Sequence, residues 1–369
     1  MIAQLLPHRE RFAHSGAGAV GLVAWHMGAA SRYRDRIGIL GAAVDAPLDP
    51  ARFVPVLPGG WWYGGGTARY LSGAACTLQR LRPRLIEVHN RPTYVRPLRR
   101  SLPDVRLMLY LHNDPRAMRG ARSPKERRQL LGRLDAIVCV SGFIRDCFLE
   151  DVDDPDGKLE VVHNAVDMAA MGTVDFAAKR KEIIFVGRTI PDKGMHLLVE
   201  AARTLLPAFP DWRVTVVGGR RFTAGSVGER GYEREQMVRL SELGAQAEIA
   251  GYLSHSDTLA RLKRAAIAVL PSLWDEPCGL THMEAMAAGC ALVTTRRGGI
   301  PEIAGDAAHY LESENAAGVA ARLLPLMTDL ALLRRSQERA HRHAEARLDI
   351  QPAVERLDAI RARCLARPA

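Results

Sequence analysis

The chain alternates short apolar runs with stretches of helical periodicity, and this alternation restricts its fold more than any other feature. A run at residues 2–6 is followed by a glycine-bearing turn, Gly16-Ala-Gly18, and by a helical pattern over residues 18–33. Strand, turn and helix in this order open a doubly wound α/β domain. The alternation continues to residue 167 and restarts at residue 182. The sequence therefore predicts an α/β protein with two such domains.

A polar stretch of low hydrophobicity, residues 168–181, separates the two halves and is typical of an interdomain linker. We predict an N-terminal domain over residues 1–167, a C-terminal domain over 182–350 and a final helical segment over 351–369. With 369 residues, 47% of them hydrophobic, the chain can bury two cores. These values argue against a small binding module.

One stretch, residues 271–289, combines acidic residues with a glycine and the start of a helix. It follows an apolar run at residues 265–270 that predicts a buried strand, and it contains Glu276 and Glu284, eight positions apart. The apolar spacing over residues 279–288 predicts a helix with a glycine cap at its C-terminus. With Glu276 in the loop and Glu284 in the second helical turn, both carboxylates can face one site.

The start of this predicted helix suits an anionic ligand. The free N–H groups of Gly279, Leu280 and Thr281 would point toward the ligand, and a helix N-terminus favours phosphate. Flanking carboxylates suit hydroxyl donors such as a ribose or another sugar. The stretch is therefore interpreted as a receptor for a phosphorylated polyol. The alternative is a solvated loop followed by an ordinary amphipathic helix.

Two cations flank a turn at the start of the second half. The predicted strand near residues 182–186 leads through Arg188 and a proline turn to Lys193, and a predicted helix follows. Two cations at the carboxyl end of a strand could clamp a diphosphate. A salt-bridged surface turn is the alternative.

The first half carries weaker signals. His112 ends an apolar run, at the edge of the sheet where α/β proteins bind ligands, and it serves either a substrate or the structure. Gly16 and Gly18 form either a phosphate-binding turn or a plain tight turn, because the third glycine of a dinucleotide fingerprint is absent. The loop at residues 59–66, with two Trp and one Tyr among glycines, is either a mobile binding loop or a connection with surface aromatics.

Positive charge is concentrated at residues 80–133, which hold fifteen Lys and Arg against four Asp and Glu, whereas the formal net charge of the whole chain is +10. Such a segment attracts an anionic membrane surface or nucleic acid, unless its cations lie on solvated helix faces. No run of eighteen apolar residues and no secretory signal is present. These features predict a cytoplasmic protein, either soluble or peripherally attached to the inner face of the membrane.

Several motifs occur together in the order and spacing of one known family, so that the chain resembles the retaining glycosyltransferases of family 4. The motifs that carry the resemblance are Glu276 with Glu284, the turn from Phe185 to Gly194, His163-Asn-Ala-Val-Asp167 and Gly298-Gly-Ile-Pro-Glu302. The resemblance implies a GT-B fold, in which two Rossmann-like domains face each other across a cleft. The nucleotide-sugar would lie mainly on the C-terminal domain, and the final helix would return to the N-terminal one.

The resemblance also implies roles for individual residues. Arg188 and Lys193 would bind the donor diphosphate and stabilise the leaving group. Glu276 would lie against the donor sugar, Glu284 would hold the ribose hydroxyls, and His112 would lie near the transferred sugar. The predicted catalytic residues are thus His112, Arg188, Lys193 and Glu276. The predicted donor-binding residues are Gly16, Gly18, Gly279, Leu280, Thr281 and Glu284.

The implied reaction is the transfer of a hexose, with retention of configuration, from a UDP- or GDP-sugar to a lipid-linked or polysaccharide acceptor in cell-envelope or exopolysaccharide synthesis. We expect neither a metal nor a cofactor, because cations and helix N–H groups would stabilise the departing diphosphate and no Asp-X-Asp motif stands at a predicted strand end. One alternative is a non-catalytic nucleic-acid-binding protein. Another is a different GT-B enzyme, such as a nucleotide-sugar epimerase or a phosphorylase.

Overall fold

The computed structural model describes residues 1–14, 16–60, 64–219 and 227–366, with only the backbone of residues 227–230. The chain divides into two compact units. Unit 1 comprises residues 1–165 and 350–369, and unit 2 comprises residues 166–349. Unit 1 is therefore assembled from two segments of the chain, whereas unit 2 is continuous.

A parallel sheet forms the centre of unit 1. Its described strands number seven, in the order β3-β2-β1-β4-β5-β6-β7. They are β1 (Ile2–Leu5), β2 (Ile37–Ala42), β3 (Phe53–Val56), β4 (Leu85–His89), β5 (Arg106–Leu111), β6 (Ala136–Cys139) and β7 (Leu159–Val161). The strand order changes direction between β1 and β4, which pair directly. In sheets of this kind, ligands bind outside the carboxyl ends of the strands at such a switch point.

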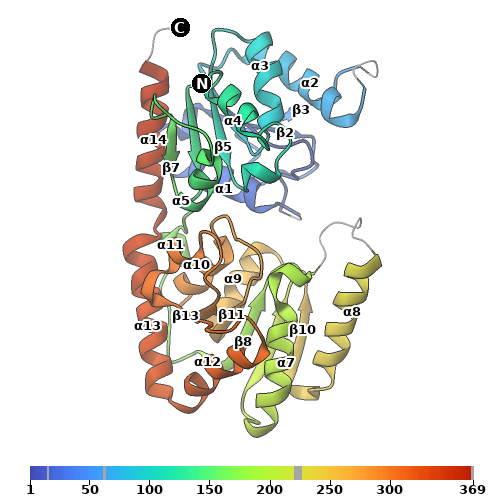
Figure 1. Cartoon of the computed structure of the whole chain (residues 1–369), viewed down its shortest axis with the longest axis vertical. Coiled ribbons are helices and arrows are strands. Elements are labelled where there is room, and N and C mark those ends of the chain that lie inside the picture. The colour runs from blue at the N-terminus through green and yellow to red at the C-terminus, as the bar shows by residue number, and fades with distance from the viewer. Residues whose placement is uncertain (15, 61–63, 220–226, 367–369) are drawn as a thin grey trace. The chain divides into compact units, whose positions relative to one another are not determined.

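Helices cover both faces of this sheet (Figure 1). The helices described in unit 1 are α1 (Ala19–Ala29), α2 (Gly66–Leu81), α3 (Val95–Ser101), α4 (Pro124–Leu131), α5 (Gly142–Leu149) and α14 (Ile350–Ala366), with the short 3-10 turns η1 (Arg34–Arg36), η3 (Pro92–Tyr94) and η4 (Pro115–Ala117). All five residues of β4 are buried, as expected for a parallel strand covered on both faces. Helix α14 packs against β4 although the whole of unit 2 lies between them in the sequence.

Unit 2 repeats this architecture. The described residues form a six-stranded parallel sheet in the order β10-β9-β8-β11-β12-β13. Its strands are β8 (Arg180–Val186), β9 (Arg213–Val217), β10 (Ala247–Gly251), β11 (Ala265–Leu270), β12 (Ala291–Thr294) and β13 (His309–Tyr310). The switch point lies between β8 and β11, which pair directly. The stretch expected as a linker, residues 168–181, contains α6 (Met168–Met171) and the first residues of β8.

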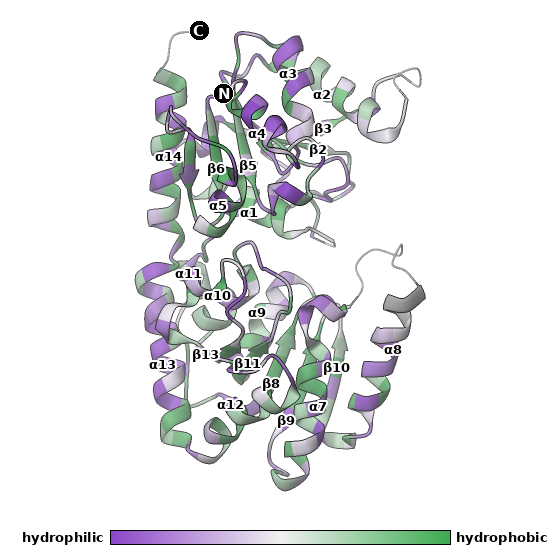
Figure 2. Cartoon of the chain, viewed as in Figure 1, coloured by the Kyte–Doolittle hydropathy of each residue, from purple (hydrophilic) through white to green (hydrophobic). Residues whose placement is uncertain are grey.

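The remaining helices of unit 2 pack around its sheet. They are α7 (Met195–Leu205), α8 (Val227–Ser241), α9 (His255–Arg264), α10 (Leu280–Ala287), α11 (Ile300–Ala304), α12 (Ala316–Thr328) and α13 (Leu330–Arg347), with the 3-10 turns η5 (Pro191–Lys193), η6 (Leu206–Ala208), η7 (Gly244–Gln246) and η8 (Gly305–Ala307). Buried side chains from the strands and helices, such as Phe185, Leu198 and Ile267, form one core. Figure 2 shows this separation, with apolar residues along the strands and hydrophilic ones on α13.

No single described helix is long and apolar enough to cross a membrane. Taken together, α12 and α13 have the length and composition for it, but the two helices are bent by 108° where they meet.

Candidate functional site

The candidate site in unit 2 is built from the two loops that follow β8 and β11 at the switch point. These loops touch at Gly194, whose φ is +68°. A Cβ at this position would lie 2.0 Å from the carbonyl oxygen of Pro271, so only glycine allows the approach. The N–H of Leu273 also donates to the carbonyl oxygen of Asp192 at 2.8 Å. The close approach fixes the side chains of the two loops relative to each other.

Lys193 and Glu276 form an ion pair across these two loops. The hydroxyl of Ser272 donates to the same carboxylate oxygen, Oε1, at 2.9 Å. The Lys193 ammonium lies 5.1 Å from the centre of the Trp274 ring, within the range of a cation–π interaction. Two of the four predicted catalytic residues are thus in contact, which the sequence did not indicate.

Burial changes the protonation behaviour of this pair. The Lys193 side chain is 18% exposed and the Glu276 side chain 9%. Burial lowers the pKa of Lys193, although the charge on Glu276 opposes the shift. Burial by itself raises the pKa of Glu276, but Lys193 and the weaker neighbouring groups outweigh it and the net shift is downward. Glu276 therefore stays an anion at neutral pH.

The backbone of Glu276 is held by the Gly298-Gly299 turn. Gly298 has a φ of +57°, and a Cβ there would lie 2.3 Å from the carbonyl oxygen of Glu276. The next N–H, that of Gly299, donates to this same oxygen at 2.7 Å. The Gly-Gly-Ile-Pro-Glu motif singled out in the sequence therefore positions the acidic loop.

Arg188 differs from Lys193 in having no internal role. Its side chain is exposed, and it makes no hydrogen bond or ion pair with any residue that the structure describes. A guanidinium offers five donors in a planar fork that matches phosphate. Arg188 is therefore available to an anionic ligand at the switch point.

Helix α10 begins beside these charges. Gly279 is its N-cap, with a φ of +74°, and Gly289 follows the helix with a φ of +72°. Within the described part of the chain, the N–H groups of Leu280 and Thr281 have no acceptor, as is usual in a first helical turn. Their positive partial charge favours a phosphate.

Glu284, in the second turn of α10, is held by a residue that sequence reasoning missed. The Nε2 atom of His255 lies 2.7 Å from Oε1 of Glu284. This hydrogen bond, together with the charge on Glu284, raises the pKa of His255 against the opposing effect of burial. His255 is the first residue of α9, next to the N-cap Ser254. No sequence motif pointed to His255.

Unit 1 contains the other candidate residues. His112 directly follows β5 and is 7% exposed. The backbone N–H of His112 donates to the side-chain oxygen of Asn90 at 3.1 Å, and its ring Nε2 lies 3.0 Å from Nδ1 of His89. Asn90 follows β4 with a φ of +55°, a conformation that asparagine tolerates better than most residues. Burial is the main cause of a pKa of His112 well below its usual value, so the ring is neutral.

The glycine turn before α1 already holds a carboxylate of the chain itself. Oε1 of Glu10 accepts the N–H of Gly18 at 2.6 Å and that of Gly21 at 3.1 Å. Gly16 has a φ of +100° and gives the turn its left-handed step. Of the residues singled out in the sequence, the aromatic positions 61–63 and the last three residues of the predicted final segment, 367–369, lie outside the described residues.

The described residues contain no group of three or more His, Cys, Asp or Glu side chains that could hold a metal ion.

Two family models match consecutive parts of the chain. Residues 30–170 match the model described as Glycosyltransferase Family 4, and residues 171–343 match Glycosyl transferases group 1. The chain belongs to the family 4 glycosyltransferases. The family expected from the sequence is confirmed, and the chain is an enzyme.

Curated relatives of this glycosyltransferase agree with the family. A protein of Bacillus subtilis named as a glycosyltransferase, YtcC, is 28% identical over 298 residues, which cover 75% of this chain and 72% of that protein. The phosphatidyl-myo-inositol mannosyltransferase of Mycolicibacterium smegmatis is 28% identical over 193 residues, which cover 49% of this chain and 47% of the relative.

Solved structures agree on the fold. Sucrose-phosphate synthase from Thermosynechococcus elongatus has a TM-score of 0.79 at 16% identity, covering 99% of both chains. HepE of Anabaena in complex with UDP-glucose has a TM-score of 0.77 at 16% identity, covering 98% of this glycosyltransferase and 100% of that chain. With its two parallel sheets, this glycosyltransferase has the GT-B fold expected from its sequence.

Proposed function

We propose that this glycosyltransferase transfers a hexose, with retention of configuration and without a metal ion or cofactor, from a UDP- or GDP-sugar to a lipid-linked or polysaccharide acceptor in cell-envelope or exopolysaccharide synthesis. One observation carries the proposal, namely the charges at the switch point of unit 2. There Lys193 pairs with Glu276, and Arg188 is exposed without a described partner. The UDP-glucose in the Anabaena structure supports a nucleotide-sugar donor.

The chemistry follows from where charge develops. The bond between the sugar C1 and the diphosphate oxygen breaks, and C1 bonds to the acceptor oxygen. The electron pair of the broken bond leaves with the diphosphate, which also takes the acceptor proton. Lys193, Arg188 and the N-terminus of α10 stabilise the negative charge on this leaving group, and preorganised electrostatic stabilisation of this kind is usually the largest catalytic term.

The carboxylates position the donor rather than exchange protons. Glu276 holds the Lys193 ammonium and accepts a hydroxyl of the donor sugar. Glu284 accepts a ribose hydroxyl through the oxygen that His255 does not occupy. The N–H groups of Gly279, Leu280 and Thr281 bind the phosphates.

Unit 1 supplies the other donor contacts in this proposal. His112 hydrogen-bonds the transferred sugar, and the turn with Gly16 and Gly18 approaches the phosphates. Because Glu10 already accepts the Gly18 N–H, a phosphate reaches this N–H only if the Glu10 side chain moves away.

The acceptor proposal includes contact with an anionic membrane. Part of the basic segment serves the structure, since Arg99 and Arg106 pair with Asp135 and Arg127 is buried on carbonyl oxygens. Exposed cations that make no hydrogen bond or ion pair with a described residue include Arg82, Arg96, Arg100 and Arg119. These four arginines are available to bind a negatively charged surface. The mannosyltransferase relative, named for a phosphatidylinositol acceptor, supports a lipid-linked one.

A liposome experiment tests the membrane part of the proposal. We expect sedimentation with vesicles rich in anionic lipid at low salt, and loss of binding when Arg96, Arg100 and Arg119 are replaced by Ser. Replacement of Arg335, Arg339 and Arg342 on α13 by Ser is the matched control, because it also removes three exposed cations and these lie outside the basic segment. Equal binding by both variants, or none by the wild type, would remove the membrane from the proposal.

The donor is tested by thermal shift with UDP-, GDP- and ADP-sugars, followed by NMR of the product. We expect stabilisation by one UDP- or GDP-sugar, slow donor hydrolysis in excess chelator, and transfer that retains the anomeric configuration. Conversion of the sugar nucleotide without hydrolysis or transfer would point to an epimerase. Salt-sensitive oligonucleotide binding with no response to any sugar nucleotide would contradict the donor proposal.

A further inference from the structure

His89 lies directly behind His112 and is fully buried. It ends β4, and its Nδ1 is 3.0 Å from Nε2 of His112. Tyr110 pairs with His89 in the sheet register and stacks on both imidazoles, at 5.3 Å from His89 and 4.6 Å from His112 between ring centres. The two histidines are therefore held in one orientation by packing and by a shared hydrogen bond.

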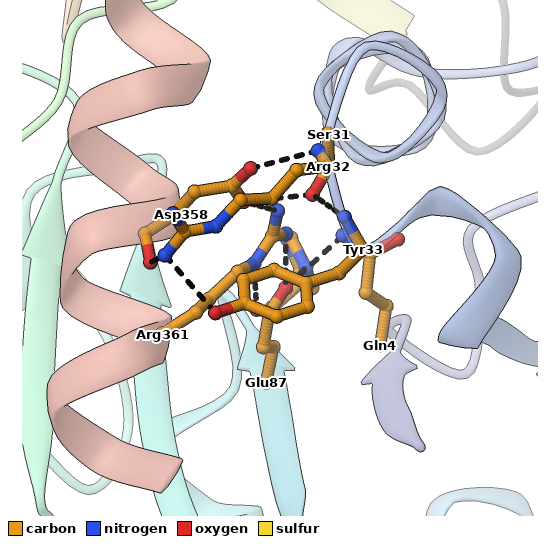
Figure 3. A network of polar contacts seen from close by, with 8 residues as sticks. Gln4, Ser31, Arg32, Tyr33, Glu87, Asp358 and Arg361 are labelled. Atoms are coloured by element: carbon orange, nitrogen blue, oxygen red, sulfur yellow. Dashed lines mark hydrogen bonds and ion pairs between the residues drawn. The ribbon is translucent and has the colours of Figure 1, made fainter. Parts of the chain in front are cut away.

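A buried ionic network lies on the other side of His89. Glu87 is on the same face of β4, two residues before His89, and is 0% exposed. Its two carboxylate oxygens accept Nε and Nη2 of Arg361 in α14, at 2.6 and 2.9 Å. Gln4 donates to the second oxygen, Oε2, at 3.0 Å. Asp358 accepts the remaining Nη1 of Arg361 at 2.9 Å. Figure 3 shows how these groups converge from α14, β4 and β1.

The surroundings of Nε2 indicate which nitrogen of His89 carries the proton. Burial, reinforced by the charge of Arg361, lowers the pKa of His89 to about 3, so the ring is neutral and has one N–H. Its Nε2 atom has no hydrogen-bond partner among the described residues. The nearest carboxylate oxygen, Oε2 of Glu87, is 4.0 Å away and already accepts two donors. A buried N–H without an acceptor is rarer than a buried acceptor without a donor, so the proton belongs on Nδ1.

We propose that His89 is a positioning residue that donates its Nδ1–H to Nε2 of His112 and thereby keeps His112 as a neutral ring with its proton on Nδ1. Nδ1 of His112 makes no hydrogen bond with a described residue, so it is left to face a ligand. His112 then acts toward the substrate as a hydrogen-bond donor to an oxygen atom, and not as a base. This inference rests on the proposed function for its catalytic consequence, but the tautomer is a property of the free protein.

The tautomer can be measured directly in the wild-type glycosyltransferase by ¹⁵N NMR with labelled histidine, using His112→Gln and His89→Asn to assign the signals. We expect His112 to show a protonated Nδ1 and an unprotonated Nε2, unchanged between about pH 5.5 and 8.5, since both rings are neutral in this range. A protonated Nε2 on His112, or titration of His112 within this range, would overturn the proposal. This measurement needs no substrate and no activity.

Two substitutions at His89 test the consequence for transfer. In His89→Asn, the side-chain amide keeps a donor near the position of Nδ1, whereas His89→Leu fills a similar volume without a donor. For His89→Leu we expect a fall in kcat of at least about 10-fold, as for other lost preorganised hydrogen bonds, with the donor KM changed by less than about 2-fold. His89→Asn should recover most of the rate. Equal kinetics of the two variants would contradict a positioning role.

The outcomes separate this inference from the proposed function. If His112→Ala transfers sugar at the wild-type rate, His112 has no catalytic role. The NMR measurement on the wild type then still decides whether the proposed tautomer is correct. If His112→Ala is impaired but the wild-type ring carries its proton on Nε2, the proposed function stands and the role of His89 fails. Should His89→Leu not fold, the wild-type spectrum alone decides the tautomer.

Discussion

Both units place a carboxylate and a cation near the switch point of a parallel sheet, but the two pairs have different environments. In unit 1, Glu87 and Arg361 are both 0% exposed, and Arg361 comes from a helix 274 residues away in the sequence. In unit 2, the side chains of Glu276 and Lys193 are 9% and 18% exposed. Both residues lie in the connections that follow β11 and β8. The same kind of ion pair is therefore fully buried in one unit and partly exposed in the other, where it lies in the proposed donor site.

Burial and partners, and not residue type, distinguish the structural charge Arg361 from Lys193, for which we propose a role in binding the donor. Arg361 makes three hydrogen bonds to Glu87 and Asp358 and is 0% exposed, so no ligand can reach it. The Lys193 ammonium has three donors and gives one to Glu276. The predictions below test this difference, from the largest expected effect to the smallest.

Replacing Arg361 by Met should give the largest effect, a loss of about 3–5 kcal/mol in the free energy of unfolding of unit 1, because Glu87 remains as an uncompensated buried charge. Denaturant unfolding measures this loss. Arg356→Met on the same helix is the matched control, since its side chain is 59% exposed, and it should change stability by less than about 0.5 kcal/mol. An Arg361→Met, Glu87→Leu double variant should recover part of the loss.

Replacing Lys193 by Ala should lower turnover more than about 10-fold, equivalent to about 1.4 kcal/mol of transition-state stabilisation, with a smaller loss of stability than in Arg361→Met. Steady-state kinetics with the identified donor measure the effect. Lys181→Ala, an exposed lysine of β8 that pairs with Asp211, is the control and should leave turnover unchanged. A Lys193→Ala variant that kept full turnover but lost as much stability as Arg361→Met would erase the distinction between the two pairs.

Replacing Glu284 by Ala should weaken nucleotide-sugar binding by about 10-fold, the value expected for one lost charge-assisted hydrogen bond. Calorimetric titration measures the Kd. Glu345→Ala, a 56% exposed glutamate of α13, is the control. Unchanged affinity in Glu284→Ala would contradict its role at the ribose.

The smallest expected effect is a pH dependence of unit 2 that comes from His255. Its pKa is raised in the folded state, first by the hydrogen bond to Glu284. The stabilisation is therefore fully present below the unfolded pKa of about 6.5 and is lost as pH rises through the higher folded value. Because the side chain is 32% exposed, the contribution should stay below about 1 kcal/mol.

His255→Gln keeps a neutral donor near the position of Nε2 and does not titrate. Its stability relative to the wild type should therefore be lowest near pH 6 and approach the wild-type value near pH 9, as measured by denaturant unfolding. The exposed His14 provides the control substitution, His14→Gln. A difference between wild type and His255→Gln that does not change with pH would contradict this assignment.

The sequence predicted the fold well because the fold depends on local patterns. Apolar runs followed by glycine turns mark the strand ends, and these patterns led to two doubly wound domains with Arg188, Lys193, Glu276 and Glu284 at strand ends of the second. The helix predicted at residues 279–288 is observed as α10, Leu280–Ala287.

What the sequence could not predict is which side chains meet across the fold. Lys193 and Glu276 are 83 residues apart, and Glu87 and Arg361 are 274 apart. A period of two places Glu87 and His89 on one face of a strand, but it says nothing of the partner. The carboxylate of Glu10 on the glycine turn likewise gave no sequence signal, because no regular spacing connects a loop residue to a helix start.

The place of Arg361 in the sequence has a consequence for synthesis of the protein. Glu87 emerges from the ribosome early, but its cation follows all of unit 2 in the sequence. Unit 2, being continuous, has all of its own residues available before α14 is made. During translation unit 1 therefore contains a central carboxylate without its counter-ion, so the first unit to begin synthesis is the last to complete its interior.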